Sequence, residues 1–301
     1  MKIKCGFVSI LGLPNAGKSS LINAIVGEKV SIVSPKPQTT RNNILGIYND
    51  DDSQIVFVDT PGLNSQGTGL DKFMQKSIKG STTDVNIVLL AVDITKGISK
   101  KDKEIIHTYL DAKTNLVVVL TKCDLVSADV IAKNIMDIAG QTENKCEIVP
   151  LSSLQHKNLD SLLQVIKKFL PEVDKNERYY EEDEYTDKPL NFIVAEVVRE
   201  KALYLLDKEV PHGIAVLTQK YEDNGQLVTI DMDIICDRET HKAIILGSQG
   251  SMLKKIGHNA RVTIQKIVQK KVVLNLFVKV KPNWKNNPEY LNSLGYNIND
   301  L

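Results

Sequence analysis

The stretch GLPNAGKS, Gly12–Ser19, decides the fold of the first half of this 301-residue chain. It matches the pattern GxxxxGK[ST] and lies between an apolar run, residues 6–11, and a helical pattern. In such a loop, backbone N–H groups surround phosphates, the lysine reaches the β- and γ-phosphates, and the serine hydroxyl binds Mg²⁺. The motif predicts a nucleoside triphosphate site made of Gly12, Leu13, Pro14, Asn15, Ala16, Gly17, Lys18, Ser19 and Ser20.

Apolar runs alternate with amphipathic helical patterns over residues 1–170, at residues 6–12, 54–59, 85–93, 115–121 and 147–152. Runs that are apolar on both faces and separated by helices are typical of a parallel sheet with helices on both sides. Two strand-like runs within residues 42–59 predict a hairpin and hence one antiparallel edge strand. We therefore expect an α/β domain at residues 1–170.

The segment Asp59-Thr60-Pro61-Gly62 ends the second of these runs. A carboxylate there can hold the shell of a magnesium ion, and the Gly62 N–H can contact a γ-phosphate. Because the segment loses this contact when the γ-phosphate leaves, it is expected to be a conformational switch.

The base is expected to be read by Thr121-Lys122-Cys123-Asp124, which follows the run at residues 115–120. A carboxylate at Asp124 can accept hydrogen bonds from N1–H and the 2-amino group of guanine. Adenine has neither donor, so it would leave the carboxylate unpaired and be rejected. The turn Ser152-Ser153-Leu154 could add backbone contacts to the guanine oxygen, an expectation that rests on its position alone.

Composition excludes several classes of protein. The chain has 38 basic and 37 acidic residues, so its total charge predicts no partner. Its cysteines form no CxxC pair and no zinc spacing, which favours free thiols in a reducing cytosol. The start MKIKCGFVSILGL imitates a signal peptide but stops at residues 14–18, and no segment approaches the roughly 18 apolar residues of a membrane span. We expect a soluble cytoplasmic chain.

The second half begins after an acidic linker at residues 171–189, which has eight acids and three bases, although Tyr179, Tyr180 and Tyr185 could attach it to one domain. Residues 190–301 form a second predicted unit. We expect a helix at residues 191–210, a hairpin around Asn224-Gly225, a strand at residues 241–247, two helical stretches around Gly257 and a long strand at residues 271–284.

A loop with the pattern GXXG, Gly247-Ser248-Gln249-Gly250, lies within a run from His241 to Pro288 that has ten Lys or Arg and no acid. Strand, GXXG and helix are the expected context of a KH loop, which clamps the backbone of about four single-stranded nucleotides. Chance surface charge is the alternative, and this loop lacks the basic residue that many KH loops carry. The predicted RNA-binding residues are Gly247, Ser248, Gln249, Gly250, Lys254, Lys255, Arg261, Lys281 and Trp284.

The ordered set GLPNAGKS, PQTTR, DTPG, TKCD and SSL resembles translation-factor-like GTPases, and with FIVAEVVREK, VPHGIAV and LGSQGSMLKKIGHNAR it resembles the Era family of bacterial ribosome-assembly GTPases. The resemblance implies a P-loop GTPase domain followed by a type II KH domain, with GTP or GDP and Mg²⁺ as cofactors. It implies that Thr40 binds Mg²⁺ and meets the γ-phosphate, with Thr39 the alternative. Ser19, Thr40 and Asp59 would then hold the metal.

The same resemblance implies partners and a place in the cell. These are the 3′ region of 16S rRNA, the 30S subunit, and peripheral association of a monomer with the inner face of the membrane. GTP would order the switch loops and thereby change the RNA affinity of the KH unit.

One position departs from the family pattern, and another lacks a residue that many GTPases carry. Thr121 replaces an asparagine, so we expect the amide that ties the base loop to the phosphate loop to be lost while Asp124 keeps guanine specificity. Leu63 replaces a glutamine that orients the attacking water in many GTPases. Either turnover is slow, or another element completes a catalytic set of Lys18, Thr40, Gly62 and Asn15, the last through a potassium ion. A tRNA-modifying GTPase and a non-enzymatic RNA-binding adaptor are the alternative functions.

Overall fold

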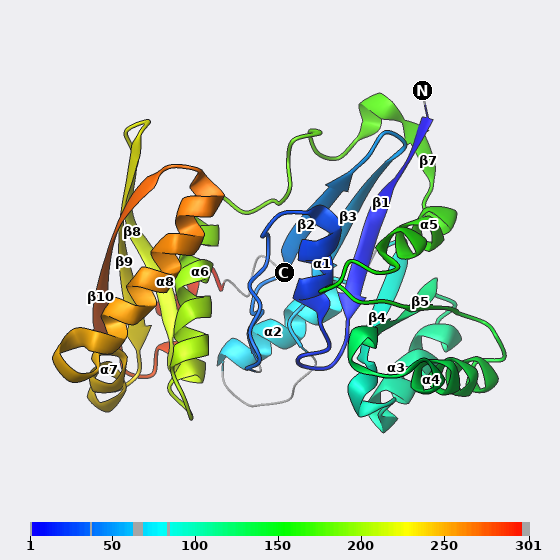
Figure 1. Ribbon diagram of the computed structural model, residues 1–301, viewed down its shortest axis with the longest axis horizontal. Coiled ribbons are helices and arrows are strands. Elements are labelled where there is room, and N and C mark those ends of the chain that lie inside the picture. Colours follow the sequence, from blue (N-terminus) through cyan, green and yellow to red (C-terminus); the bar gives the residue numbers. More distant parts are fainter. Residues whose placement is uncertain (1, 37, 63–68, 83–84, 297–301) are drawn as a thin grey trace. The chain divides into compact units, whose positions relative to one another are not determined.

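The computed structural model describes residues 2–296 except residues 37, 63–68 and 83–84 (Figure 1). The chain divides into two compact units. The first contains residues 1–31, 40–64 and 77–187, and the second contains residues 32–39, 65–76 and 188–301. No helix in the described ranges is both long and apolar enough to cross a membrane.

The sheet of the first unit has the strand order β2-β3-β1-β4-β5-β6 (Figure 1). The strands are β1 (Lys2–Leu11), β2 (Ile44–Asn49), β3 (Ser53–Asp59), β4 (Ile87–Asp93), β5 (Leu116–Thr121) and β6 (Glu147–Pro150). β2 pairs antiparallel with β3, and the other neighbours in this order are parallel. Because β3, β4 and β5 are buried along their whole length, they read as continuous apolar runs. The predicted mostly parallel sheet with one antiparallel edge is confirmed.

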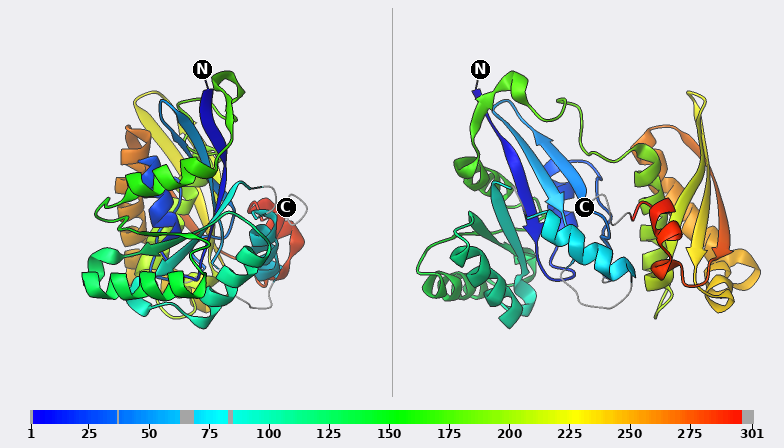
Figure 2. Two further views of the ribbon diagram at one scale, coloured as in Figure 1. Left: turned by 90° about the vertical axis from the view of Figure 1, so that its right-hand side faces the viewer. Right: turned by 180° about the vertical axis from the view of Figure 1, so that it is seen from behind.

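Helices cover both faces of this sheet (Figures 1 and 2). α1 (Lys18–Val26) and α5 (Leu159–Phe169) supply apolar side chains to the core on one face. α3 (Lys100–Asp111) and α4 (Ala128–Gln141) supply the core on the other. α2 (Gly69–Gly80) follows β3. The carboxyl ends of the parallel strands share one edge, where ligands bind in open α/β sheets.

Residues 171–187, called the strap below, pack against the first unit. The short strand β7 (Glu172–Asp174) pairs antiparallel with the start of β1. The ring of Tyr179 lies 4.8 Å from that of Phe7, and the carbonyl oxygen of Tyr185 accepts a hydrogen bond from the N–H of Ile47. The tyrosines therefore attach the acidic stretch to one unit, the alternative that its composition left open.

The second unit contains a sheet in the order β10-β9-β8 with helices packed on it (Figure 1). Its elements are α6 (Leu190–Leu205), β8 (Ala215–Asp223), β9 (Leu227–Cys236), α7 (Glu239–Leu246), α8 (Ser251–Val268), β10 (Lys271–Val280) and α9 (Pro288–Ser293). β10 runs parallel to β9, and β8 runs antiparallel to it. Side chains of α6, α7 and α8 share one core with β9.

Two predicted elements of this unit are wrong. Residues 241–247 were expected to form a strand, but residues 241–246 belong to α7 and Gly247 caps it; Ile245 is buried and Ile244 is 49% exposed. A run of this length is compatible with either a strand or a helix, so its sequence does not decide. The two helical stretches expected around Gly257 are one continuous helix, α8, in which Gly257 faces Leu276.

Short 3-10 turns complete the connections, at Ile94–Lys96, Cys123–Leu125, Lys175–Glu177, Pro211–Gly213, Ser248–Gly250 and Trp284–Asn286.

Candidate functional site

The phosphate loop joins β1 to α1 at the carboxyl edge of the sheet. Its backbone has positive φ at Gly12 (151°), Asn15 (64°) and Gly17 (86°). A Cβ at Gly12 would lie 2.4 Å from the carbonyl oxygen of Ala91, so only glycine fits there. Gly17 caps α1 without a side-chain hydrogen bond, which leaves the first N–H groups of the helix able to bind a phosphate.

Lys18 is folded back over this loop. Its side chain is buried, and Nζ donates hydrogen bonds to the carbonyl oxygens of Gly12 (3.0 Å) and Leu13 (3.3 Å). Burial lowers the pKa of Lys18 to about 8, an effect that the charge of Asp59 partly offsets. The ammonium group is therefore held where the β- and γ-phosphates of a triphosphate would lie.

Three oxygen-bearing side chains meet beside the loop. Oδ2 of Asp59 accepts a hydrogen bond from the Ser19 hydroxyl (2.7 Å), and the hydroxyl oxygens of Ser19 and Thr40 are 2.9 Å apart. Asp59 Oδ1 is buried and has no hydrogen-bond partner among the described residues. Hydroxyl and carboxylate oxygens are the donors that Mg²⁺ prefers, and a buried carboxylate oxygen without a donor is what a cation would satisfy. The set thus fits a magnesium ion.

Of the two candidate switch threonines, the structure places Thr40 at this set. Thr39 is directed elsewhere, since its Oγ1 lies 2.8 Å from Ser34 Oγ and donates to the carbonyl oxygen of Lys36. Ser31, which sequence reasoning missed, donates to Asp59 Oδ2 at 2.6 Å. Burial raises the pKa of Asp59, and the Ser31 hydrogen bond and the Lys18 charge act against this rise.

The segment after Asp59 returns to the phosphate loop. The Thr60 hydroxyl donates to the carbonyl oxygen of Ile10 (2.7 Å), and a Cβ at Gly62 would lie 3.2 Å from the Cα of Pro14. Pro61 links these two contacts. Leu63, which the sequence singled out for catalysis, lies outside the described residues.

Thr121 supplies a link that the sequence analysis did not anticipate. Its hydroxyl lies 2.8 Å from the carbonyl oxygen of Ala16 and 3.1 Å from that of Val92, so the base loop remains tied to the phosphate loop without the asparagine amide. This link forms because the Thr121 side chain is buried next to the phosphate loop. A Cβ at Gly17 would lie 3.6 Å from it.

Lys122 and Asp124 follow in a tight turn. Lys122 has φ 60°, and its Nζ donates to Asp93 Oδ2 at 2.6 Å. Burial acts to raise the pKa of Asp93, but hydrogen bonds from Lys122 and Thr95 outweigh it and hold the pKa below its usual range. Asp93 therefore positions the lysine, a role that the sequence analysis missed. Its signal was available, because Asp93 ends β4 at the edge where Asp59 ends β3.

The turn Ser152-Ser153-Leu154 lies next to the base motif, since the N–H of Cys123 donates to the carbonyl oxygen of Leu151. The Ser152 hydroxyl accepts a hydrogen bond from the N–H of Gln155 (3.1 Å), and the Leu154 side chain is exposed. The Ser152 side chain thus closes the turn, and a contact to a base would come from the backbone.

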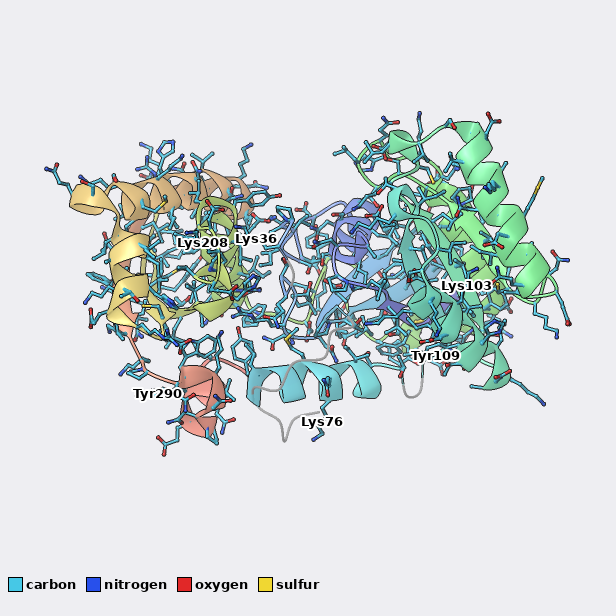
Figure 3. All side chains as sticks on the ribbon, turned by 90° about the horizontal axis from the view of Figure 1, so that it is seen from below. Lys36, Lys76, Lys103, Tyr109, Lys208 and Tyr290 are labelled. Carbon is cyan, nitrogen blue, oxygen red and sulfur yellow. The ribbon has the colours of Figure 1, made fainter. Side chains whose placement is uncertain are left out.

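Part of the first switch belongs to the second unit. The N–H of Val33 donates to Glu200 (3.0 Å), the buried Arg199 donates to the carbonyl oxygen of Thr39 (2.5 Å), and Lys36 binds Asp207 (3.0 Å) beyond the end of α6 (Figure 3). These contacts hold Val33, Lys36 and Thr39 against α6 and the residues that follow it, and Thr39 directly precedes Thr40.

The GSQG loop joins α7 to α8. Positive φ values occur at Gly247 (70°), Gln249 (49°) and Gly250 (76°), and a Cβ at Gly247 would lie 2.7 Å from Met252. Ser248 and Gln249 are exposed. A short exposed loop of this kind brings backbone close to a ligand.

A groove of about 450 Å³ lies between α8, the helix after this loop, and the edge strand β10. Phe277, which the sequence analysis missed, lies on it and is 53% exposed, so its ring could stack on a base. Lys254, Lys255 and Arg261 are exposed, and no ion pair within the described part of the chain includes them. The groove is lined by Leu253, Lys254, Gly257, His258, Arg261, Leu274, Asn275, Leu276 and Phe277.

Trp284 corrects one predicted RNA-binding residue. It was expected at the RNA surface but is fully buried, and its indole N–H donates to the carbonyl oxygen of Gly213 (3.1 Å). Its ring packs 6.4 Å from that of Tyr296 because the chain turns back on itself after β10. Lys281 lies 5.3 Å from the ring of Tyr290 on α9, labelled in Figure 3.

Some basic residues of the acid-free run are paired with carboxylates in the folded structure. Lys270 pairs with Asp223, Lys279 with Asp233 and Lys285 with Asp237, all carboxylates contributed from outside the run. The cationic surface is therefore concentrated along α8 rather than spread over all ten basic residues.

Comparisons with known proteins agree with both sites. The family described as 50S ribosome-binding GTPase matches residues 7–122, and the family described as KH domain matches residues 209–285. GTPase Era of Clostridium botulinum (strain Alaska E43 / Type E3) is 46% identical over 295 residues, which cover 97% of this chain and 98% of that protein. The chain belongs to the GTPase Era family.

Other members of the Era family show similar agreement. GTPase Era of Clostridioides difficile (strain 630) is 41% identical over 98% of this chain and 99% of its own length. A crystallised variant of Aquifex aeolicus Era bound to GDP·AlF4⁻ is 39% identical, with a TM-score of 0.92 over 98% of this chain and 100% of that chain. Era in complex with MgGDPNP and nucleotides 1506–1542 of 16S ribosomal RNA is also 39% identical, with a TM-score of 0.91 over 98% and 99%.

This Era-family chain is therefore a GTPase with a C-terminal KH domain. The resemblance and the fold class predicted from sequence are confirmed, and the non-enzymatic alternative is set aside.

Proposed function

We propose that the chain is a GTP-dependent RNA-binding switch that binds the 3′ region of 16S rRNA and assists maturation of the 30S subunit. The observation that carries this proposal is the exposed GSQG loop directly before α8, the helix that lines a groove with β10, in the same chain as an assembled triphosphate loop. The related Era chain in complex with nucleotides 1506–1542 of 16S ribosomal RNA supports this RNA as the partner.

Each part of the nucleotide site has a proposed task. Lys18 binds the β- and γ-phosphates, the Gly62 N–H contacts the γ-phosphate, and Asp124 reads guanine. Ser19, Thr40 and Asp59 hold Mg²⁺, which neutralises charge on the phosphates when bound. Thr40 is at the metal set only while its segment is ordered, so it reports the presence of the γ-phosphate.

Slow hydrolysis is part of the proposal. A leucine at position 63 has no group that could orient the attacking water. We assign to Asn15, which stands in the phosphate loop with φ 64°, the binding of a potassium ion that would stabilise transition-state charge. Turnover in KCl should then exceed turnover in NaCl, and Asn15→Ala should remove the difference. Equal turnover in both salts would contradict this assignment.

Coupling to the second unit would pass through the first switch. Thr40 belongs to the metal set, and its neighbour Thr39 accepts a hydrogen bond from Arg199 of α6. Ordering of Thr40 by GTP would therefore constrain a segment that packs against the RNA-binding unit. This supports a nucleotide-dependent RNA affinity.

The primary test is binding of a fluorescein-labelled RNA that copies the 3′-terminal segment of 16S rRNA, with a scrambled RNA of equal composition as control. Titrations use Mg²⁺, a non-hydrolysable GTP analogue and fixed salt. Tight binding of the native sequence, weakened at least tenfold in Lys254→Ala/Arg261→Ala, is expected. Equal binding of both RNAs would overturn the assignment of this partner.

We also propose, as the family resemblance implies, that the chain is a cytoplasmic monomer that associates peripherally with the inner membrane face. Light scattering of the purified chain tests the oligomeric state. Fractionation of cells at low and high salt tests the association with the membrane.

A further inference from the structure

Ser31 reaches the proposed metal set from outside the phosphate loop. Its side chain is buried, and its hydroxyl donates to Oδ2 of Asp59 at 2.6 Å. The hydrogen bonds that Ser19 and Thr40 donate to the same oxygen are longer, at 2.7 and 3.4 Å. Ser19 and Thr40 are proposed metal ligands and lie 2.9 Å from each other, whereas no hydrogen bond in the described part of the chain joins the Ser31 hydroxyl to either. Within the set, Ser31 therefore contacts only the carboxylate.

Asn23 of α1 fixes the backbone of Ser31. Its Oδ1 accepts hydrogen bonds from the N–H groups of Val30 (3.1 Å) and Ser31 (2.9 Å), and its Nδ2 donates to the carbonyl oxygen of Ser31 (2.7 Å). Two donors face one end of the amide and an acceptor faces the other, so the orientation of the Asn23 side chain is determined. Because α1 begins at Lys18, the helix that carries the phosphate-binding lysine also holds Ser31.

These contacts decide which oxygen of Asp59 meets a cation. Oδ2 already accepts hydrogen bonds from Ser31 and Ser19, whereas Oδ1 is buried and has no donor among the residues that the structure describes. Two hydrogen bonds to one oxygen hold the carboxylate against rotation about its Cβ–Cγ bond. Oδ1 is thus presented in a fixed direction to a cation or to a water molecule in the shell of that cation.

Ser31 can hold the carboxylate without a γ-phosphate. It is grouped with Asp59 in the first unit, whereas residues 32–39 are grouped with the second. In the proposed switch, Thr40 is at the metal set only while its own segment is ordered, but Ser31 is tied to α1 through Asn23. The hydrogen bond from Ser31 to Asp59 therefore persists in the GDP state, where fewer ligands hold the metal.

We infer that Ser31, clamped by Asn23, is a positioning residue that aligns Asp59 for Mg²⁺ in both the GDP and the GTP state. The inference rests on the proposed metal set of Ser19, Thr40 and Asp59 and adds a residue outside the ligand shell. Removing an outer-shell partner of a metal ligand lowers metal affinity by roughly 10- to 100-fold.

The test uses Mn²⁺ as the probe, because oxygen ligands that suit Mg²⁺ also bind Mn²⁺. Electron paramagnetic resonance measures free Mn²⁺ in titrations of the full chain saturated with GDP or with a non-hydrolysable GTP analogue. Ser31→Ala should weaken Mn²⁺ binding about tenfold in the GDP complex, and less in the analogue complex, where Thr40 and the γ-phosphate also hold the metal. GDP affinity in excess EDTA should not change, because Ser31 acts through the metal carboxylate.

Ser53→Ala is the matched control. Ser53 is buried and donates to Oδ1 of Asp50 (2.8 Å) at the start of β3, whereas Asp59 ends that strand. The control removes the same kind of hydrogen bond away from the metal set and should retain the wild-type Mn²⁺ affinity. A comparable loss in Ser53→Ala, or wild-type affinity in the GDP complex of Ser31→Ala, overturns the inference.

A double-mutant cycle tests the clamp. Asn23→Ala should weaken Mn²⁺ binding to the GDP complex of the wild-type chain but add little in the Ser31→Ala background, because it acts through the same hydroxyl. Fully additive losses overturn the role of Asn23. If the wild-type chain binds no Mn²⁺ in either nucleotide complex, the proposed metal set fails, and the inference fails with it.

Discussion

The hydroxyl of Thr121 lies 2.8 Å from the carbonyl oxygen of Ala16 and so links the base-reading loop to the phosphate loop. Both groups are buried. A residue that breaks the family pattern thus keeps the contact that the pattern provides. The guanine motif and the phosphate loop can still act as one rigid site.

Replacing this hydroxyl should weaken nucleotide binding. Thr121→Val has nearly the same shape but no donor, and it leaves a buried carbonyl without its partner at a cost of about 1–3 kcal/mol. We expect GTP and GDP affinity to fall about tenfold in Thr121→Val and to stay within about twofold in Thr121→Ser. Isothermal titration calorimetry measures both. Equal affinity in the Val and Ser variants would mean that the hydroxyl contributes nothing.

Lys18 should make GTP affinity depend on pH. Burial lowers the pKa of Lys18 to about 8, and Asp59 offsets only part of the effect. Bound phosphates favour the charged form, so binding takes up a proton above that pH, and affinity falls as pH rises through 8. Titrations at pH 7.5, 8.0, 8.5 and 9.0, each in two buffers of different ionisation enthalpy, measure this uptake.

The control for this prediction is Lys18→Arg, which remains charged throughout the range. Its affinity is expected to be lower but independent of pH. A wild-type chain that shows no proton uptake between pH 8 and 9 would contradict the burial of Lys18 in the nucleotide-free site.

Gln54 should hold the strap in place. Its buried Oε1 accepts hydrogen bonds from the N–H groups of Tyr179 (2.9 Å) and Tyr180 (3.1 Å), and its Nε2 donates to the carbonyl oxygen of Tyr180 (2.8 Å). Gln54→Ala should cost about 1–3 kcal/mol of unfolding free energy and expose Arg178 to trypsin. Gln164→Ala, on the exposed face of α5, is the matched control and should change neither. Equal cleavage in both variants would show that the strap is held by other contacts.

Two aromatic residues of the second unit should separate stability from RNA binding. Trp284 is buried, so Trp284→Phe should lower the unfolding free energy by about 1–3 kcal/mol through the lost hydrogen bond and volume, with RNA affinity within twofold. Phe277 is half exposed beside the groove, so Phe277→Ala should weaken RNA binding about tenfold, since stacking on one base contributes about 1–3 kcal/mol.

Thermal unfolding and RNA titration of the same two preparations make the comparison. A larger loss of RNA affinity in the Trp284 variant than in the Phe277 variant would reinstate the tryptophan as the RNA contact.

A feature could be predicted from the sequence where the residues that define it are contiguous. The phosphate loop was predictable because its glycines, lysine and serine are contiguous and need only the strand before and the helix after. Asp59 ends one buried strand and Asp124 comes shortly after another, so their placement at one edge of the sheet also follows from the parallel order. The family resemblance also rests on contiguous sequence motifs.

The errors arose where burial or pairing is decided by distant residues. Residues 241–247 were wrongly predicted to form a strand, because an apolar run of that length fits either a strand or a helix. Only packing against β9 and α8 decides between the two. Trp284 was read as exposed from its lysine neighbours, although its burial depends on Gly213 and Tyr296. Phe277 carries no motif, and only the folded sheet shows that it lies on the groove, whereas Asp93 could have been found because it ends a buried strand as Asp59 does.

The most direct test of the central claim measures RNA affinity in three nucleotide states. The 3′-terminal RNA of 16S rRNA is titrated with Mg²⁺ and a non-hydrolysable GTP analogue, with Mg²⁺ and GDP, and without nucleotide, all at one salt concentration. We expect the tightest RNA binding with the GTP analogue, because an ordered Thr40 constrains the neighbouring segment, which Arg199 holds. Equal affinity in all three states would contradict a switch and leave two functions that share one chain without coupling.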